Sequence, residues 1–174
     1  GYFLRKYIQE ATSFEPGKEA VSKHHWVIYR YAETLLTYAE SMVNAFNDVN
    51  YTDETYKYSA LWAINEVRKN ADMPLIPSMG KDEFMERLYN EWRVEFAFED
   101  HRFFDVRRWK LYDNVTSTQR ELYGVKIEKQ ADGTFNFYKN LYETRNWRDC
   151  MYLYPIPQSE LYKNTNLNPQ NTGW

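Results

Sequence analysis

The stretch NEWRVEFAFEDHRFFDVRRW, residues 90–109, decides the fold of this chain. It alternates acidic and basic residues with aromatic ones and contains no proline or glycine. The spacing of its apolar residues predicts a helix that begins near Lys81 and runs through the whole stretch. On such a helix Glu91, Glu95 and Glu99 fall on one stripe, each about one turn from the next. This arrangement is compatible with a pair of catalytic carboxylates or with an ion network that holds the fold.

The ion network is the favoured interpretation, because so many charges interleaved with Phe and Trp cannot all face water. We predict that the arginines of the stretch, Arg107 among them, pair with its acids and with Glu33 or Glu40 of an earlier helix. The predicted structural network consists of Arg93, Glu95, Glu99, Arg102, Asp105 and Arg108.

Glycoside hydrolysis by Glu95 and Glu99 is the less favoured interpretation. The two carboxylates of a glycosidase lie roughly 5–9 Å apart and flank the scissile bond from opposite sides of the sugar. Two residues on one face of one helix normally cannot do this, so the predicted helix argues against the reaction.

Helical periodicity also marks a run of about twenty residues from Trp26 to near Asn47 and a second run from Tyr56 to Val67. A short polar loop joins the two runs, and small residues such as Ala39 and Ala63 allow close contact. They are therefore expected to pack as an antiparallel helical hairpin of the tetratricopeptide-like type.

After the third helix, which Ser78 or Asp82 is expected to cap, the helical period fails beyond Tyr112. Alternating residues around Ala131-Asp132-Gly133 predict a small β-hairpin in a region of long loops, and QSEL after Pro157 predicts one helical turn. The predicted fold is mostly α-helical: a helical hairpin, a third long helix, a small β-hairpin and long loops.

Composition and motifs exclude several classes of function. A net charge of −3 provides no basic field for nucleic acid. The single Cys150 excludes an internal disulfide framework. The chain lacks HExxH, paired Glu-x-x-His and glycine-rich phosphate motifs, and no run reaches the roughly 18 apolar residues of a membrane span. We expect no cofactor and no metal, with the adjacent pair His24 and His25 as a weak alternative metal site.

The stretch 90–109 resembles the signature of the SusD/RagB family, E-x-R-x-E-x-x-F-E-G-H-R-x-x-D-x-x-R-W. The matching residues are Glu91, Arg93, Glu95, Phe98, Glu99, His101, Arg102, Asp105, Arg108 and Trp109. Further motifs follow in the family order: YRYAETLLTYAE (29–40), INEVRKNADMP (64–74), YPIPQSEL (154–161) and NPQNTGW (168–174). Asp100 stands where the family usually has glycine and Trp92 where arginine is common; the first is expected to alter a local turn.

The resemblance covers residues 27–174 and implies the C-terminal part of a SusD-like protein, with 1–26 as an irregular lead-in and 113–153 as a variable loop and hairpin region. It implies a non-catalytic surface lipoprotein of Bacteroidetes-type bacteria that captures glycans, or peptides in some members. The expected partner is a SusC-like TonB-dependent transporter of the outer membrane. The expected location is the cell surface, through a lipid anchor that this chain lacks. A tetratricopeptide-like adaptor for another protein is a further alternative.

The family motif residues hold the fold and assign no ligand, so candidate ligand residues come from the aromatic region 112–154. Sugars bind to aromatic faces and to polar groups on loops that a rigid scaffold positions. We predict Trp147 as the best ligand-binding candidate, with Tyr142, Asn146 and Arg145 beside it. The alternative, more frequent for any single ring, is that these rings pack the hairpin against the helices.

Overall fold

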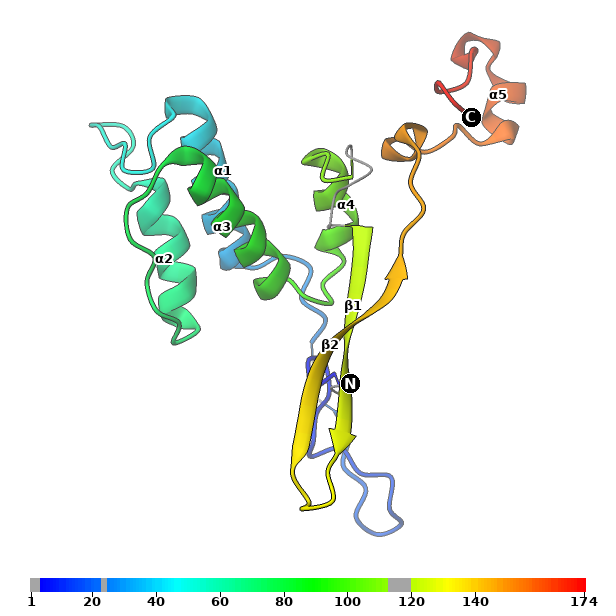
Figure 1. The fold of residues 1–174 in the computed structure, drawn as a ribbon. Helices are drawn as coiled ribbons and strands as arrows, with labels where there is room; N and C mark the ends of the chain where they lie inside the picture. The colour runs from blue at the N-terminus through cyan, green and yellow to red at the C-terminus, as the bar shows by residue number, and fades with distance from the viewer. Residues whose placement is uncertain (1–3, 23–24, 113–119) are drawn as a thin grey trace. The chain divides into compact units, whose positions relative to one another are not determined.

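A computed structural model describes residues 4–22, 25–112 and 120–174 of the chain. The described chain is mostly helical with a single two-stranded antiparallel sheet, which confirms the predicted fold class (Figure 1). It divides into two compact units, one of Lys6–Arg102 and the other of Phe103–Trp174 with the N-terminal residues up to Arg5. No helix among the described residues is both long and apolar enough to cross a membrane.

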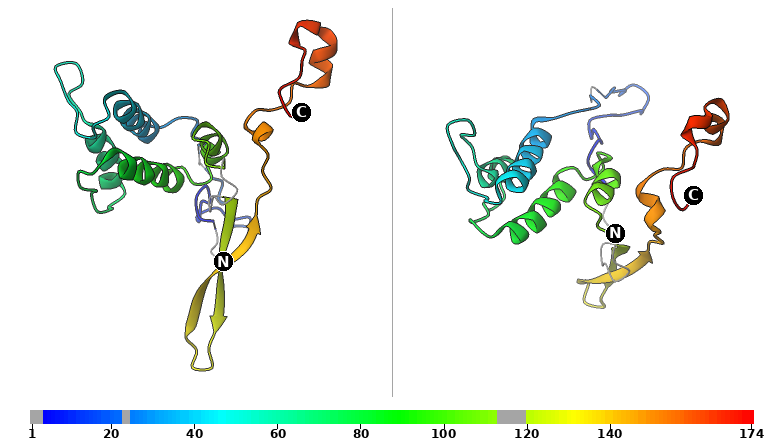
Figure 2. Two further views of the ribbon diagram at one scale, coloured as in Figure 1. Left: turned by 45° about the horizontal axis from the view of Figure 1, so that its top comes forward. Right: turned by 90° about the horizontal axis from the view of Figure 1, so that it is seen from above.

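The first unit contains α1 (Tyr31–Phe46), α2 (Ala60–Asn70) and α3 (Lys81–Glu95). Helix α1 packs against both α2 and α3, as the views of Figures 1 and 2 show. Its buried residues recur at helical spacing, and small side chains at the contact let the helices approach closely. The side chains that are completely buried in this core are Leu36, Ala39, Val43, Ala60, Ala63, Ile64, Phe84 and Leu88.

The predicted end of α1 is confirmed, whereas its predicted start at Trp26 is wrong. Asn47 adopts a left-handed conformation with φ 56° and its N–H bonds the carbonyl of Val43, which ends the helix. The chain enters the helix only at Tyr31, after an extended Arg30. Trp26 is 69% exposed, so the apolar residues before Arg30 do not bury a helical face.

Helix α3 begins at Lys81 as predicted, but Gly80 is its N-cap and no side chain caps it, so capping by Ser78 or Asp82 is wrong. The prediction of one helix through residues 90–109 is also wrong. Helix α3 ends at Glu95, and α4 begins only at His101 and ends at Arg108. Between them Phe98 and Asp100 have φ values of 64° and 65°, a left-handed conformation that no α-helix can contain.

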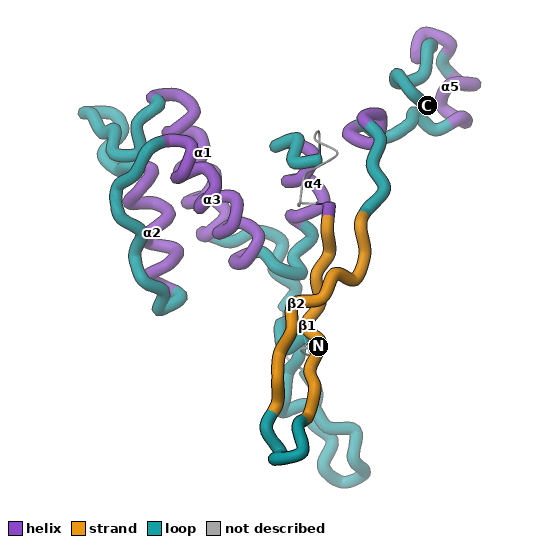
Figure 3. The backbone as a smooth tube through the Cα atoms, viewed as in Figure 1, coloured by secondary structure: helices purple, strands orange, loops and turns teal. Residues whose placement is uncertain are grey.

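The second unit contains an antiparallel ribbon of β1 (Glu121–Lys129) and β2 (Phe135–Thr144), drawn in orange in Figure 3. The predicted turn is confirmed: Gly133 has φ 86°, and Asp132 Oδ1 accepts a hydrogen bond of 2.9 Å from the Thr134 N–H.

The strand register gives the ribbon an apolar and a polar face. Tyr123 pairs with Leu141 and Ile127 with Phe137 on the apolar face, whereas the pair of Glu128 and Asn136 belongs to the polar face. A register irregularity between Leu122 and Tyr123 leaves Tyr142 without a cross-strand partner.

The chain after the ribbon forms the short helices η2 (Asp149–Tyr152), α5 (Gln158–Lys163) and η3 (Thr165–Leu167). Helix α5 confirms the predicted helical turn. The Gln170 side chain accepts a bond of 2.7 Å from the Ile156 N–H and donates one of 2.8 Å to its carbonyl. Asn171 donates to the carbonyl of Tyr154 at 2.6 Å. The amides of NPQNTGW therefore tie the C-terminal segment to YPIP.

Candidate functional site

Three glutamates of the 90–109 stretch, Glu91, Glu95 and Glu99, form ion pairs with cations from elsewhere in the chain. The Arg30 guanidinium donates Nε to Glu99 Oε2 at 2.9 Å and Nη2 to Glu99 Oε1 at 3.0 Å, and Nη1 also pairs with Glu95. Its carbon lies 4.3 Å from the centre of the Phe96 ring. Lys6 forms a further ion pair with Glu99. One arginine thus binds two carboxylates and covers an aromatic ring, and Lys6 supplies the second positive charge.

The electrostatics of Glu99 follow from this clamp. Burial opposes ionisation of the carboxyl, but the hydrogen bonds and charges of Arg30 and Lys6 outweigh burial and hold the pKa of Glu99 below its ordinary value. Burial likewise opposes the charge on Arg30, and its bonds to Glu99 and Glu95 outweigh this and raise the pKa of the guanidinium. Both groups are therefore charged at neutral pH.

A second ion pair joins α2 to α3. Arg68 Nη1 lies 2.5 Å from Glu91 Oε2, and the Glu91 residue is only 6% exposed. Arg68 Nε also donates to the carbonyl of Pro74 at 2.8 Å. A buried carboxylate of this kind needs its cation, because an unpaired charge in the interior is costly. The pair therefore fixes how the two helices face each other.

The predicted network has the expected kind of contacts but partly different partners. Arg108 Nε pairs with Asp105 Oδ1 at 3.0 Å, as predicted. The pairing of Glu95 and Glu99 with Arg30 was not predicted, and Arg93 is exposed on α3. Arg102 is half-buried. Glu33, the expected partner from the first helix, lies 3.5 Å from His101 Nε2.

The described residues contain no cluster of His, Cys, Asp or Glu large enough to hold a metal ion. His24 lies outside the described residues, so the alternative site at His24 and His25 stays a prediction.

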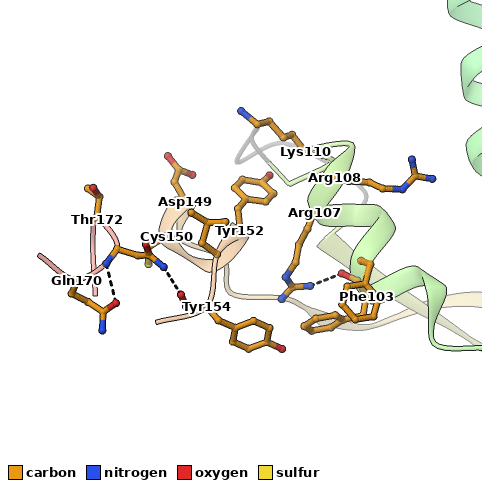
Figure 4. Close-up of a pocket in the computed structure, with 13 residues that line it drawn as sticks. Phe103, Arg107, Arg108, Lys110, Asp149, Cys150, Tyr152, Tyr154, Gln170 and Thr172 are labelled. Atoms are coloured by element: carbon orange, nitrogen blue, oxygen red, sulfur yellow. Dashed lines mark hydrogen bonds between the residues drawn. The ribbon is translucent and has the colours of Figure 1, made fainter. Parts of the chain in front are cut away.

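The candidate binding site is an open pocket of about 1220 Å³ in the second unit (Figure 4). One wall is the end of α4 and the residues after it; the other is η2 with the segments that the NPQNTGW amides tie together. The lining residues are Phe103, Phe104, Arg107, Arg108, Lys110, Asp149, Cys150, Tyr152, Leu153, Tyr154, Gln170, Asn171 and Thr172.

Arg107 is the best-positioned cation of the pocket. Its guanidinium carbon lies 3.6 Å from the centre of the Phe103 ring and 5.3 Å from that of the Trp147 ring. Nη1 donates to the Phe103 carbonyl at 2.7 Å, which Figure 4 draws as a dashed line. The Phe103 and Tyr154 rings lie nearly parallel, with centres 6.0 Å apart. The pocket thus presents aromatic surface beside a fixed positive charge.

The predicted ligand residues are not gathered in this pocket. Trp147 is half-buried, and its ring meets those of Tyr112 and Tyr152 edge-on at 4.8 Å and 4.7 Å. Arg145 Nη1 donates to the Tyr112 hydroxyl at 2.9 Å, so Arg145 and Trp147 share one aromatic neighbour.

The other two predicted residues are exposed: Asn146 follows β2, and Tyr142 on β2 is 80% exposed. None of the four predicted residues is among those that line the pocket. Trp147 contacts the lining through Tyr152 and Arg107. The sequence did contain a signal for the lining residues Phe103 and Arg107, because both belong to the 90–109 stretch, but the ion-network interpretation assigned that stretch to structure alone.

Comparison with known proteins places this geometry in a family. Residues 1–174 match the sequence profile described as the SusD family. The chain is 32% identical over 162 residues to SusD-like protein P2 of Formosa agariphila, covering 88% of this chain and 26% of that protein. The chain thus spans about a quarter of the length of this curated relative.

Solved structures agree with this match. A SusD-like protein of Bacteroides fragilis is 32% identical with a TM-score of 0.64, over 86% of this chain and 26% of the other. A SusD superfamily protein of Parabacteroides distasonis, 24% identical with a TM-score of 0.53 over 86% and 27% of the two chains, shares the fold. The family profile covers the motif of residues 90–109, the helical hairpin and the amide-tied C-terminal segment together. This chain belongs to the SusD family.

Proposed function

We propose that this chain is part of a protein that binds glycans at the cell surface without cleaving them. The protein then delivers the bound glycans to a SusC-like TonB-dependent transporter for import. Family membership supports a nutrient-binding role. Surface exposure at the outer membrane, a lipid anchor and the transporter partnership are parts of the same proposal. Peptides are the alternative ligand within it.

The pocket is the observation that carries this proposal. Phe103, Phe104, Tyr152 and Tyr154 supply aromatic faces on which the C–H surface of a sugar can lie, and polar groups beside them can bond hydroxyls. Hydrolysis needs two carboxylic acids that flank the bond. Asp149 is the one carboxylic acid among the described lining residues. The pocket is therefore suited to holding a saccharide rather than to cleaving it.

The ion pairs argue against the alternative hydrolase at Glu95 and Glu99. A general acid must be protonated near neutral pH, which requires a raised pKa. The pKa of Glu99 is lowered instead, because Arg30 and Lys6 outweigh the effect of burial. Glu95 is bound to the same Arg30. Both carboxylates act as anchors for the segment before α1.

Native affinity electrophoresis tests the proposal. The 174-residue chain would be run through gels that contain a panel of polysaccharides, and each gel would then be assayed for new reducing ends. We expect retardation by at least one polysaccharide and no new reducing ends. New reducing ends that Glu95→Gln or Glu99→Gln abolishes would establish the hydrolase instead.

Tyr154→Ala locates the binding surface. This substitution removes a ring from the pocket but leaves the Tyr154 carbonyl that Asn171 bonds, so the amide tie stays intact. Tyr162→Ala on α5 is the matched control, because Tyr162 is 79% exposed and lies outside the pocket. Retardation should fall for Tyr154→Ala and stay unchanged for Tyr162→Ala. Equal retardation of both variants would place the glycan elsewhere.

A further inference from the structure

We propose that the pocket beside α4 selects acidic saccharides, and that Arg107 binds the carboxylate or sulfate ester of the bound sugar. This inference rests on the proposed glycan-binding function and names the chemical class of its ligand. Three observations carry it: the charge of the lining, the positioning of Arg107 and the aromatic surface next to it.

The charge of the pocket is opposite to that of the chain. Among the described residues, Arg107, Arg108 and Lys110 line it together with one carboxylic acid, Asp149, whereas the chain as a whole carries a net charge of −3. Arg108 is partly neutralised by its pair with Asp105. A local positive field in an acidic protein attracts anions to one place on the surface and repels them from the rest.

Arg107 is held in place by contacts that leave its charge uncompensated. The Phe103 and Trp147 rings and the Phe103 carbonyl fix the guanidinium, yet no carboxylate among the described residues lies within ion-pair distance of it. A guanidinium has five N–H donors in one plane, and the Phe103 carbonyl takes one of them. The remaining donors suit a planar carboxylate or a sulfate, which arginine binds through two hydrogen bonds at once.

Lys110 adds a second cation without a carboxylate partner in the described part of the chain. It follows α4 at φ 52°, its N–H bonds the carbonyl of Arg107 at 3.1 Å, and its side chain is exposed. The helix dipole also favours cations at the C-terminal end of a helix. The dipole can explain why cations occur here, but it does not explain why the Arg107 guanidinium is held against two aromatic rings.

The rings complete the match to a charged sugar. Phe103 carries the guanidinium on its face, and the Tyr154 ring lies nearly parallel to it at 6.0 Å. A saccharide that places its acidic group on Arg107 therefore has aromatic surface within reach for its C–H face. An inorganic anion would use only the charge, whereas an acidic saccharide uses both features.

The test compares polymers that share a backbone and differ in charge. Isothermal titration calorimetry of the whole chain would use polygalacturonate against its methyl-esterified form, and dextran sulfate against dextran. The first pair probes carboxylates and the second probes sulfate esters. We expect at least about tenfold tighter binding of the charged member in one of the two pairs, with an affinity that falls as salt rises.

Variants tie the preference to Arg107. Arg107→Gln should lose about tenfold in affinity for the preferred charged polymer, which corresponds to about 1.4 kcal/mol, and Lys110→Gln should lose severalfold. Arg93→Gln is the matched control, because Arg93 is exposed on α3 and outside the pocket. Since Arg107 also packs on rings, thermal melting of each variant is measured first. If Arg107→Gln unfolds, Lys110→Gln still tests the proposal, because the exposed Lys110 side chain can be replaced without disturbing the fold.

The outcomes separate the two proposals. Equal binding of charged and neutral polymers, or an equal loss in Arg107→Gln, Lys110→Gln and Arg93→Gln, would overturn the acidic-ligand inference and leave glycan binding intact. Absence of binding to every polysaccharide, charged or neutral, would overturn the proposed function and this inference with it.

Discussion

Arg30 donates two hydrogen bonds, of 2.9 and 3.0 Å, to the two carboxylate oxygens of Glu99, although 69 residues separate them in the chain. The Glu99 side chain is only 10% exposed, so the pair is largely withdrawn from solvent. A planar, bidentate contact of this kind specifies geometry as well as energy. It connects the residue that precedes α1 with the turn that follows α3.

Arg30→Ala should therefore destabilise the chain by on the order of 2–4 kcal/mol, because it leaves Glu95 and Glu99 partly buried without their arginine. Urea unfolding at pH 7 measures the loss. Arg87→Ala is the control: Arg87 and Glu83 form an exposed pair at 3.9 Å, and exposed pairs contribute less than about 1 kcal/mol. Equal unfolding midpoints for the two variants would show that the clamp contributes no more than a surface pair.

The lowered pKa of Glu99 predicts a loss of stability in acid. The unfolded carboxyl has a pKa near 4.5 and the folded one lies below it. Because the folded pKa is the lower one, the stabilisation is fully present above the unfolded value and is lost as pH falls through the folded value. Unfolding free energies measured from pH 6 down to pH 3 should fall less steeply for Glu99→Gln than for the parent. Parallel curves for the two proteins would contradict this assignment.

Asp100 occupies the position where the family usually has glycine, and its φ of 65° explains that preference. Glycine adopts a left-handed conformation at little cost, Asp tolerates it and alanine does so poorly. Asp100→Gly should match or exceed the parent in melting temperature, while Asp100→Ala should lose about 1 kcal/mol. A higher melting temperature for Asp100→Ala than for Asp100→Gly would contradict the backbone explanation, and an equal loss in both variants would assign the effect to the carboxylate.

Gly173→Ala should destabilise the C-terminal segment. Gly173 has φ 90°, and an added Cβ would lie 2.8 Å from Cys150 Cβ. The substitution combines backbone strain with a clash and should cost roughly 1–3 kcal/mol. It should also loosen Trp174, whose indole N–H bonds the Cys150 carbonyl at 2.9 Å, so Cys150 should react faster with a thiol reagent. Gly124→Ala is the control, because nothing lies within 4 Å of its added Cβ; if Cys150 reacts at one rate in both variants, the strain argument fails.

Trp147 stays a predicted ligand residue, with a more specific role than the sequence suggested. Its ring lies 5.3 Å from the Arg107 guanidinium, and a contact of this kind contributes about 0.5–1 kcal/mol. Trp147→Ala should weaken retention by the retarding polysaccharide about two- to fivefold, and Trp147→Phe should weaken it less. Retention that is unchanged in Trp147→Ala, with an unchanged melting temperature, would remove Trp147 from the site.

Local sequence patterns predicted those features of the fold that depend on neighbouring residues. The end of α1 at Asn47, the start of α3 at Lys81 and the turn at Gly133 each follow from residues within a few positions. The break after Glu95 does not, because helix-forming residues continue through it and nothing in the local pattern requires a left-handed turn. The sequence indicated the break only at Asp100, because the glycine that the family usually has at this position suggests a left-handed backbone conformation.

The site was predictable to a smaller extent for a related reason. Lys6 lies in the lead-in to which the sequence assigned no role, and Arg30 precedes a helix whose start was misplaced. Contacts across 69 residues or more cannot be inferred from periodicity. The pocket is lined by Phe103 and Arg107 of the 90–109 stretch and by Tyr154 of the YPIPQSEL motif, and the sequence assigned a ligand to none of them. Only the folded chain brings their side chains together.

The two-stranded ribbon has a consequence for how this chain behaves at high concentration. Within the described residues each strand has one partner, so β1 and β2 each expose an outer edge of N–H and C=O groups that could recruit a strand from another molecule. Its exposed apolar face adds to that hazard. Such pairing between molecules is opposed by three lysines of the ribbon, Lys126, Lys129 and Lys139, and by the bulge at Tyr142. Charged lysines and a bulge of this kind disfavour strand pairing between molecules.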